Sequence, residues 1–173
     1  MVLSKVNLKE SKRIDFTGTV SSFEQFKSYG DEVVSLVRNS QGPKVLVVID
    51  RGFACEKSTP YVVRDHLNLT GTNPLVGPND PLGERFPSVN DIYVTDVLSG
   101  LPIGIAAGLQ PGIVPSPDEL KLIRSLGGDF YCYHLVPTMI VAAHARWRVL
   151  GIVLPEGAKL DSAILNVLDN GGN

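Results

Sequence analysis

The segment from 62 to 93 gathers side chains that enzymes use for proton transfer and for holding anions. Its polar residues fall into three clusters: Arg64, Asp65 and His66; Gly77, Pro78, Asn79 and Asp80; and Arg85. A histidine beside charged residues could act as a general base, because imidazole titrates near neutral pH. The alternative is a hydrogen-bonded structural residue at a strand end. Gly77 and Pro78 predict a turn. We expect the side chains of Asn79 and Asp80 to hydrogen-bond backbone groups there, and Arg85 to pair with a carboxylate.

The other nucleophiles and metal ligands are scattered along the chain. Histidines occur at 66, 134 and 144, a distribution that predicts no metal site. Cys55 and Cys132 lie far apart without metal-ligand spacing, and we expect reduced core thiols in an intracellular protein. We therefore expect neither a metal nor another cofactor.

The composition and charge of the chain argue against nucleic-acid-binding and membrane-spanning proteins. The 173 residues are 43% hydrophobic and 20% charged, with a net charge of −2, which is typical of a globular domain and gives no basic surface for nucleic acid. The N-terminus has no apolar signal region, and no apolar run approaches the roughly 18 residues that cross a bilayer. We expect one cytoplasmic domain over 1–173, with a divergent segment at 1–20 and a tail at 170–173, and no membrane partner.

Hydrophobic patterning predicts alternating strands and helices. We expect strands within 12–20, 45–50, 61–63, 101–109, 129–135 and 149–155. Helices are expected from Ser22 to about 37, with a break at Gly30 left open, and over 117–127, 137–148 and 159–170. The stretch 71–90, rich in Gly, Pro, Asn and Asp, predicts a long ordered loop.

This alternation predicts an α/β fold with a mixed, largely parallel sheet and helices on both faces. Ligands of such sheets bind at the carboxyl ends of the strands. Any active site would then be built from the loops after Asp50, Leu109, Leu135 and Leu154.

The sequence RDHLNLTGTNPLVGPND…GERFPSVNDIY resembles the central signature of the trimeric purine nucleoside phosphorylases, which include the methylthioadenosine phosphorylases. The later stretches LGGD, VP, IVAAH and RVLGI keep that family's order, and the resemblance covers roughly residues 30–157. It implies a shortened nucleoside-phosphorylase-like fold, because roughly the first third of a family enzyme has no counterpart here. In this family, phosphate attacks the anomeric carbon of a purine nucleoside and the purine leaves.

The resemblance also places the family's ligand positions on this chain, where the residue types differ. The phosphate-binding serine corresponds to His134 in the run Tyr133–Leu135, and the proton-accepting glutamate of the purine site corresponds to Pro115. The purine-binding asparagine corresponds to Gly157, beside Glu156. Ala107 and Gly108 belong to the stretch that resembles the start of the purine-binding loop. The backbone-donor strand of the phosphate site corresponds to residues 47–57, where Asp50 places a carboxylate near the expected anion.

Two hypotheses follow from these replacements. In the first, the chain keeps the family fold without its catalysis and has a structural or regulatory role, as an oligomer of itself (a trimer is one form) or with an intact phosphorylase paralogue. We then expect a structural role for His66 and the signature residues near it. In the second, Glu156, His134 and Tyr133 form a rebuilt pocket that binds or converts a purine or nucleoside. A partner chain that supplies the missing third is a further alternative.

Overall fold

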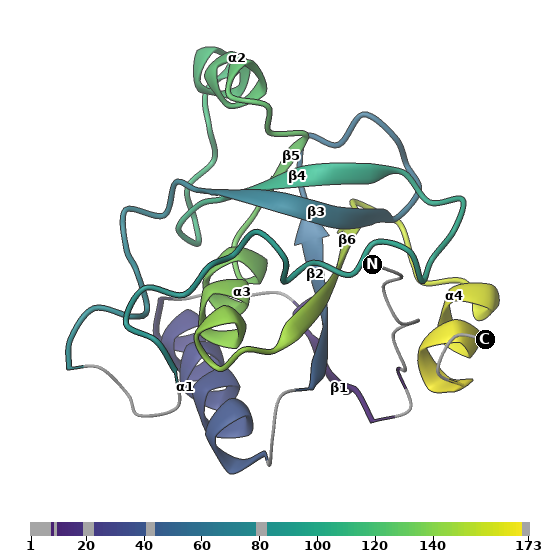
Figure 1. The fold of residues 1–173 in the computed structure, drawn as a ribbon. Helices are drawn as coiled ribbons and strands as arrows, with labels where there is room; N and C mark the ends of the chain where they lie inside the picture. The colour runs from purple at the N-terminus through teal and green to yellow at the C-terminus, as the bar shows by residue number, and fades with distance from the viewer. Residues whose placement is uncertain (1–7, 9, 19–22, 41–43, 79–82, 171–173) are drawn as a thin grey trace.

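The computed structural model describes residues 8, 10–18, 23–40, 44–78 and 83–170, with only the main chain for 23–29 (Figure 1). Within these residues, strands and helices alternate along most of the chain. Their order is β1 (Lys12–Asp15), α1 (Phe23–Asn39), β2 (Val45–Gly52), β3 (Tyr61–Asn68), β4 (Ile103–Gly108), α2 (Pro117–Ser125), β5 (Phe130–Cys132), α3 (Leu135–His144), β6 (Arg148–Pro155) and α4 (Ser162–Asn170).

The strands form one sheet in the order β1-β2-β6-β3-β4-β5. Neighbouring strands are parallel, except for β3 and β6, which run antiparallel. A further antiparallel bridge joins Phe53, just after β2, to Tyr131 of β5, so the sheet curls and brings these separated strands together. The predicted mixed, largely parallel sheet is confirmed.

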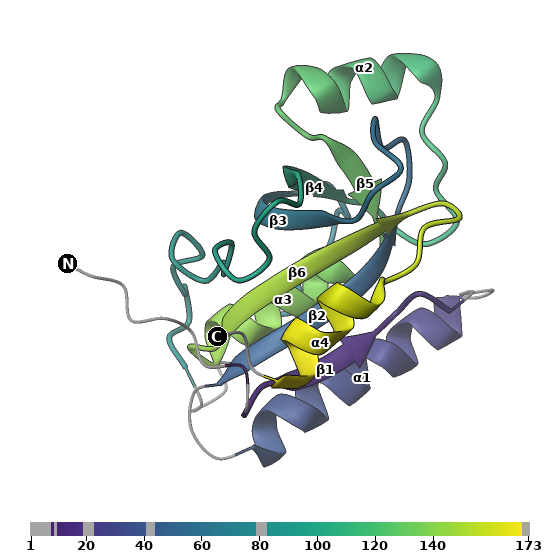
Figure 2. The same cartoon turned by 90° about the vertical axis from the view of Figure 1, so that its right-hand side faces the viewer.

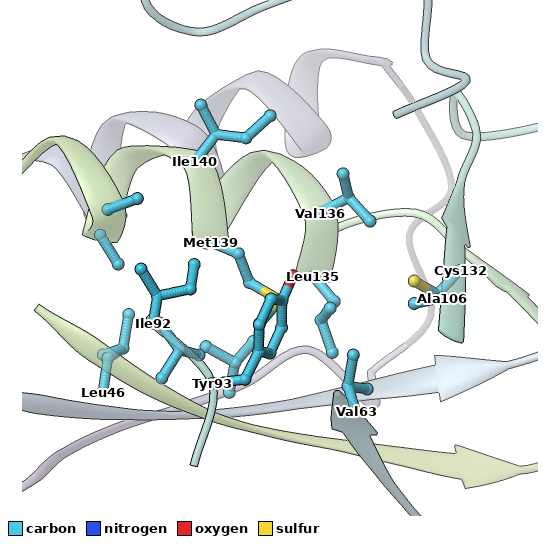
Figure 3. Close-up of a cluster of buried hydrophobic side chains, with 14 of the residues drawn as sticks. Leu46, Val63, Ile92, Tyr93, Ala106, Cys132, Leu135, Val136, Met139 and Ile140 are labelled. Atoms are coloured by element: carbon cyan, nitrogen blue, oxygen red, sulfur yellow. The ribbon is translucent and has the colours of Figure 1, made fainter. Parts of the chain in front are cut away.

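The larger core lies between the sheet and the helices α1 and α3. Val33 and Val37 of α1 and most of α3 are buried there against Leu46 and Val48 of β2. Nearly every residue of α3 is apolar, because the helix packs against the sheet on one side and α1 on another. Figure 3 shows Leu135, Val136, Met139 and Ile140 of α3 above the strands.

The opposite face of the sheet is covered by α4. Ile164 and Leu168, one helical turn apart, pack with Val47 and Ile49 of β2 and with Ile152 of β6. Figure 2 shows α4 in front of β1, β2 and β6. Helices therefore cover both faces, as the sequence predicts.

Helix α2 lies beyond the β5 end of the sheet (Figure 2). It begins as predicted: Ser116 and Glu119 form a capping box, and Pro117 takes the first helical position. These hydrogen bonds hold the pKa of the Glu119 carboxyl below its ordinary value. The guanidinium of Arg124 donates to the main-chain oxygens of Asp129 and Ala54, which ties α2 to the loop after β2.

Some predicted boundaries differ from the structure. Strand β3 continues past Val63 through the Arg-Asp-His triplet to Asn68, because β4 pairs with it over that length around a bulge at 63–65. Helix α3 begins at Leu135 rather than at Pro137, since proline is tolerated in a first turn, and it ends at His144. At Gly30, where the sequence leaves a break open, helix α1 continues without one.

The segment 71–90 behaves as predicted where it is described. Residues 71–78 and 83–90 form turns and bends with no helix or strand. Ser22, the expected cap of α1, lies outside the described residues, as do 171–173 of the predicted tail.

Candidate functional site

Asp50 joins the end of β2 to the start of α3. Its carboxylate is 1% exposed, and one oxygen accepts hydrogen bonds from the main-chain N–H groups of His134 and Leu135, each at 2.9 Å. The other oxygen lies 3.3 Å from Nδ1 of His134. The first N–H groups of a helix carry partial positive charge and commonly hold an anion. In this chain, a side chain of the protein takes that place.

His134, the N-cap residue of α3, is buried beside this carboxylate. Its ring stacks on Phe16, which follows β1, with centroids 4.8 Å apart and an interplanar angle of 13°. The main-chain N–H of Phe16 donates to the main-chain oxygen of Ile49 at 2.7 Å, which holds the backbone of Phe16 against β2. The predicted candidate His134 is therefore buried in a stacked pair of rings at the helix terminus.

A cavity of about 310 Å³ opens next to His134. Its described lining comes from α1, α3, the N-cap residue His134, Phe16 and the loop 72–74. Neither Tyr133 nor Glu156 is among these lining residues.

Tyr133 belongs to a separate aromatic cluster. Phe53 stacks on Tyr131 with centroids 5.1 Å apart and lies 5.3 Å from the ring of Tyr133. The hydroxyl of Tyr133 donates to the main-chain oxygen of Ile113 at 3.1 Å. Burial raises the pKa of Tyr133 to about 12, so its hydroxyl stays protonated at neutral pH. We call Phe53, Tyr131 and Tyr133 the aromatic cluster.

Three other residues at the predicted purine position have structural surroundings of their own. Ala107 is fully buried in the same core cluster as Tyr131, and Pro115 is buried before α2. Gly108 lies so close to Val136 that a Cβ there would come within 2.6 Å of the valine side chain. Gly108 therefore allows β4 to pack directly against α3.

Glu156 and Gly157 form an exposed turn after β6. Gly157 has a φ of +76°, a backbone conformation that favours glycine. The guanidinium of Arg51 donates to the main-chain oxygens of Pro155 at 3.4 Å and Ala158 at 2.9 Å, which holds the turn against β2. The Glu156 carboxylate lies in solvent beside this clamp.

The signature histidine pairs with a tyrosine. Nδ1 of His66 is hydrogen-bonded to the hydroxyl of Tyr93, and the Asp65 carboxylate accepts the main-chain N–H of His66 at 2.8 Å. Burial lowers the pKa of His66, and the nearby charge of Asp65 partly opposes that shift. Arg64 is exposed on the same strand.

A second cavity, of about 490 Å³, lies between His66 and the loop that follows β3. Its lining includes Gly77, which has a φ of +126°, and Arg85, whose guanidinium lies 5.9 Å from the centroid of the Phe86 ring. Pro78 is exposed next to it. Asn79 and Asp80 lie outside the described residues.

The two thiols have the character of core residues. Burial raises the pKa of Cys55 to about 11 and raises the pKa of the fully buried Cys132 as well. Thiols that stay protonated are weak nucleophiles. Within the described part of the chain, no three His, Cys, Asp or Glu side chains come together as a metal site, and no helix is long and apolar enough to span a membrane.

The sequence reasoning missed Phe16, Phe53 and Arg51. Phe16 and Phe53 are each the first residue after a strand. An aromatic residue directly after a predicted strand is the sequence signal that could have indicated them. Nothing in the local sequence indicates that Arg51 reaches the turn after β6, because that contact joins residues about a hundred positions apart.

Comparison with known proteins connects this fold to one family. Purine nucleoside phosphorylase 1 of Bacillus subtilis is 40% identical over 103 residues, covering 53% of this chain and 38% of the relative. Purine nucleoside phosphorylase 1 of Geobacillus stearothermophilus is 32% identical over 149 residues, covering 75% of this chain and 54% of the relative. The chain thus spans about half the length of the curated relatives it matches, or less. No protein-family model matches it.

Solved structures agree on the fold. Isoform 2 of purine nucleoside phosphorylase from Schistosoma mansoni, in complex with cytosine and ribose-1-phosphate, superposes with a TM-score of 0.66 at 24% identity, covering 83% of this chain and 57% of that one. A complex of the Schistosoma mansoni enzyme with BCX-34 gives the same TM-score at 22% identity, covering 80% and 62%. At such identities the likeness carries the fold alone. The curated relatives, with which this fold agrees, identify the chain as a divergent member of the purine nucleoside phosphorylase family.

Proposed function

We propose that this chain is a purine nucleoside phosphorylase-like protein that does not carry out phosphorolysis and acts through assembly, with copies of itself or with an intact phosphorylase. The observation that carries the proposal is the Asp50 carboxylate at the N-terminus of α3. In the family, the residue that corresponds to His134 binds phosphate. Here its main-chain N–H, and the next one, are already bonded to an internal anion.

Electrostatic repulsion from the Asp50 carboxylate disfavours phosphate binding at this helix terminus. A phosphate at that helix terminus would lie beside a buried carboxylate, and like charges repel strongly where water is excluded. The site would also have lost the two N–H donors that an anion needs. Without bound phosphate there is no nucleophile for the family reaction.

The purine position is also altered. Among the positions that the resemblance gives to the base, Tyr133 belongs to the aromatic cluster, Ala107 and Pro115 are buried, and Glu156 is exposed. Aromatic side chains pack well in a core, but they supply no carboxylate or amide to share protons with a leaving purine.

Assembly is supported by the signature loop. Val76 and Phe86 are 83% and 84% exposed, and both line the 490 Å³ cavity. Large apolar side chains that share an exposed hollow are typical of protein-binding surfaces. We expect Phe86→Ser combined with Val76→Ser to lower the oligomer mass measured by light scattering, without changing the circular dichroism spectrum.

The decisive experiment measures free base released from inosine, guanosine and methylthioadenosine in the presence of phosphate, at high protein concentration. We expect no release above a heat-inactivated control, while an intact phosphorylase assayed in parallel releases base. Release that is lost in Glu156→Ala or His134→Ala would overturn the proposal and support the alternative, a rebuilt nucleoside site.

A further inference from the structure

The cavity between α1 and α3 has the form of a small-ligand site. It holds about 310 Å³, at the small end of the range for ligand pockets. The loop 72–74 closes one side, and Phe16 forms part of its wall. A molecule with a single ring and a short side chain matches this size.

The walls of the cavity are mostly apolar. Val33 and Val34 come from α1, Pro137 and Val141 from α3, and the Phe16 ring is held in place by its stack on His134. Such walls favour a ligand with an apolar, preferably aromatic, body. Thr138 is only 4% exposed and lines the cavity from its buried side.

The described lining of the cavity is acidic and not basic. Among the described lining residues, Asp31 is the only carboxylate, and neither lysine nor arginine occurs. Asp31 is exposed, which places its charge at the mouth. A second carboxylate, Asp50, lies directly behind His134. An anion would therefore be repelled here, and an ammonium group would be attracted to the mouth.

We propose that this cavity binds a small primary amine with an apolar or aromatic body, with the ammonium group at Asp31 and the body against Phe16, Pro137 and Val141. This site is separate from the aromatic cluster and from the turn at Glu156. It adjoins His134, the residue at the family's phosphate position. Amine binding is nevertheless tested independently of phosphorolysis, since neither phosphate nor nucleoside takes part.

The test compares three probes that share one ring and differ in charge: phenethylamine, phenethyl alcohol and 3-phenylpropionate. Binding to the whole chain is followed by methyl NMR. We expect phenethylamine to shift the Val33, Val34 and Val141 methyl signals and to bind about tenfold more tightly than 3-phenylpropionate. Equal affinity for the amine and the acid, or shifts confined to other methyl groups, would overturn the proposal.

Asp31→Asn and Glu32→Gln form a matched pair. Both residues are exposed neighbours on α1, and only Asp31 lines the cavity, so neither change should disturb folding. Asp31→Asn should weaken the binding of phenethylamine by about fivefold and leave the affinity for phenethyl alcohol unchanged. Glu32→Gln should change neither affinity. An equal effect of the two variants would show that only diffuse surface charge attracts the amine, and the proposal would fail.

Val34→Phe fills the cavity and should abolish binding of the amine and the alcohol alike. Because Val34 is half-buried, the methyl signal of Ile164, on the opposite face of the sheet, serves as the check that this variant folds. Binding that persists in the folded variant would place the ligand elsewhere and contradict the proposal.

Discussion

A carboxylate oxygen of Asp50 lies 2.9 Å from the main-chain nitrogen of Leu135, 85 residues further along the chain, and caps helix α3 from inside the core. The same oxygen accepts the N–H of His134. The buried Asp50 side chain thus joins β2 to α3 and accepts the N–H groups at the start of that helix.

Replacing Asp50 should destabilise the fold. Asp50→Ala leaves two buried N–H groups without their acceptor, and we expect a loss of about 2–4 kcal/mol in the free energy of unfolding, measured with urea. Asp50→Asn keeps the shape and one carbonyl oxygen, so its loss should be about half as large. A change below about 0.5 kcal/mol for Asp50→Ala would contradict the capping role.

The same variant should gain an anion site. With the carboxylate removed, the N–H groups at the start of α3 are free to bind phosphate, and a ligand that binds only the folded state raises the melting temperature. We expect millimolar phosphate to raise the melting temperature of Asp50→Ala and to leave the original protein unchanged at matched ionic strength. Stabilisation of both proteins by phosphate would show that Asp50 does not exclude the anion.

The His66–Tyr93 pair should make stability depend on pH. Burial lowers the pKa of His66 in the folded protein, so the unfolded chain binds its proton more readily. The stabilising contribution is complete above the unfolded value of about 6.5 and is lost as the pH falls through the lower folded pKa. We expect the urea midpoint to fall on acidification below that value, and to fall less in His66→Asn. Parallel pH profiles for the two proteins would rule this out.

The end of α3 contains a strained residue. Arg146 has a φ of 61°, a conformation that costs a non-glycine residue about 1 kcal/mol or more. Arg146→Gly should therefore raise the free energy of unfolding by about 0.5–1 kcal/mol, as measured by urea denaturation. Arg146→Ala is the matched control, because it removes the exposed ion pair with Glu84 but keeps the strain, and it should give no gain. A gain in both variants would assign the effect to the side chain instead.

Local sequence patterns determined much of this protein. The capping box at Ser116 and Glu119, the β-branched run of β2 and the i, i+4 apolar pair of α4 each act within a few residues, and the alternation of these elements predicted the mixed sheet with helices on both faces. The signature motifs likewise indicated the family that the comparisons identify.

Only the tertiary structure decided what the candidate site residues do. Strand β3 includes the Arg-Asp-His triplet because β4 pairs with it there. Helix α1 continues through Gly30, and the valines that follow pack against the core. The curl of the sheet placed His134 next to Asp50 and Phe16, put Tyr133 in a different cluster, and left Glu156 in solvent. Contacts between residues 84 or more positions apart depend on how strands pair and curl, and no local pattern encodes that geometry.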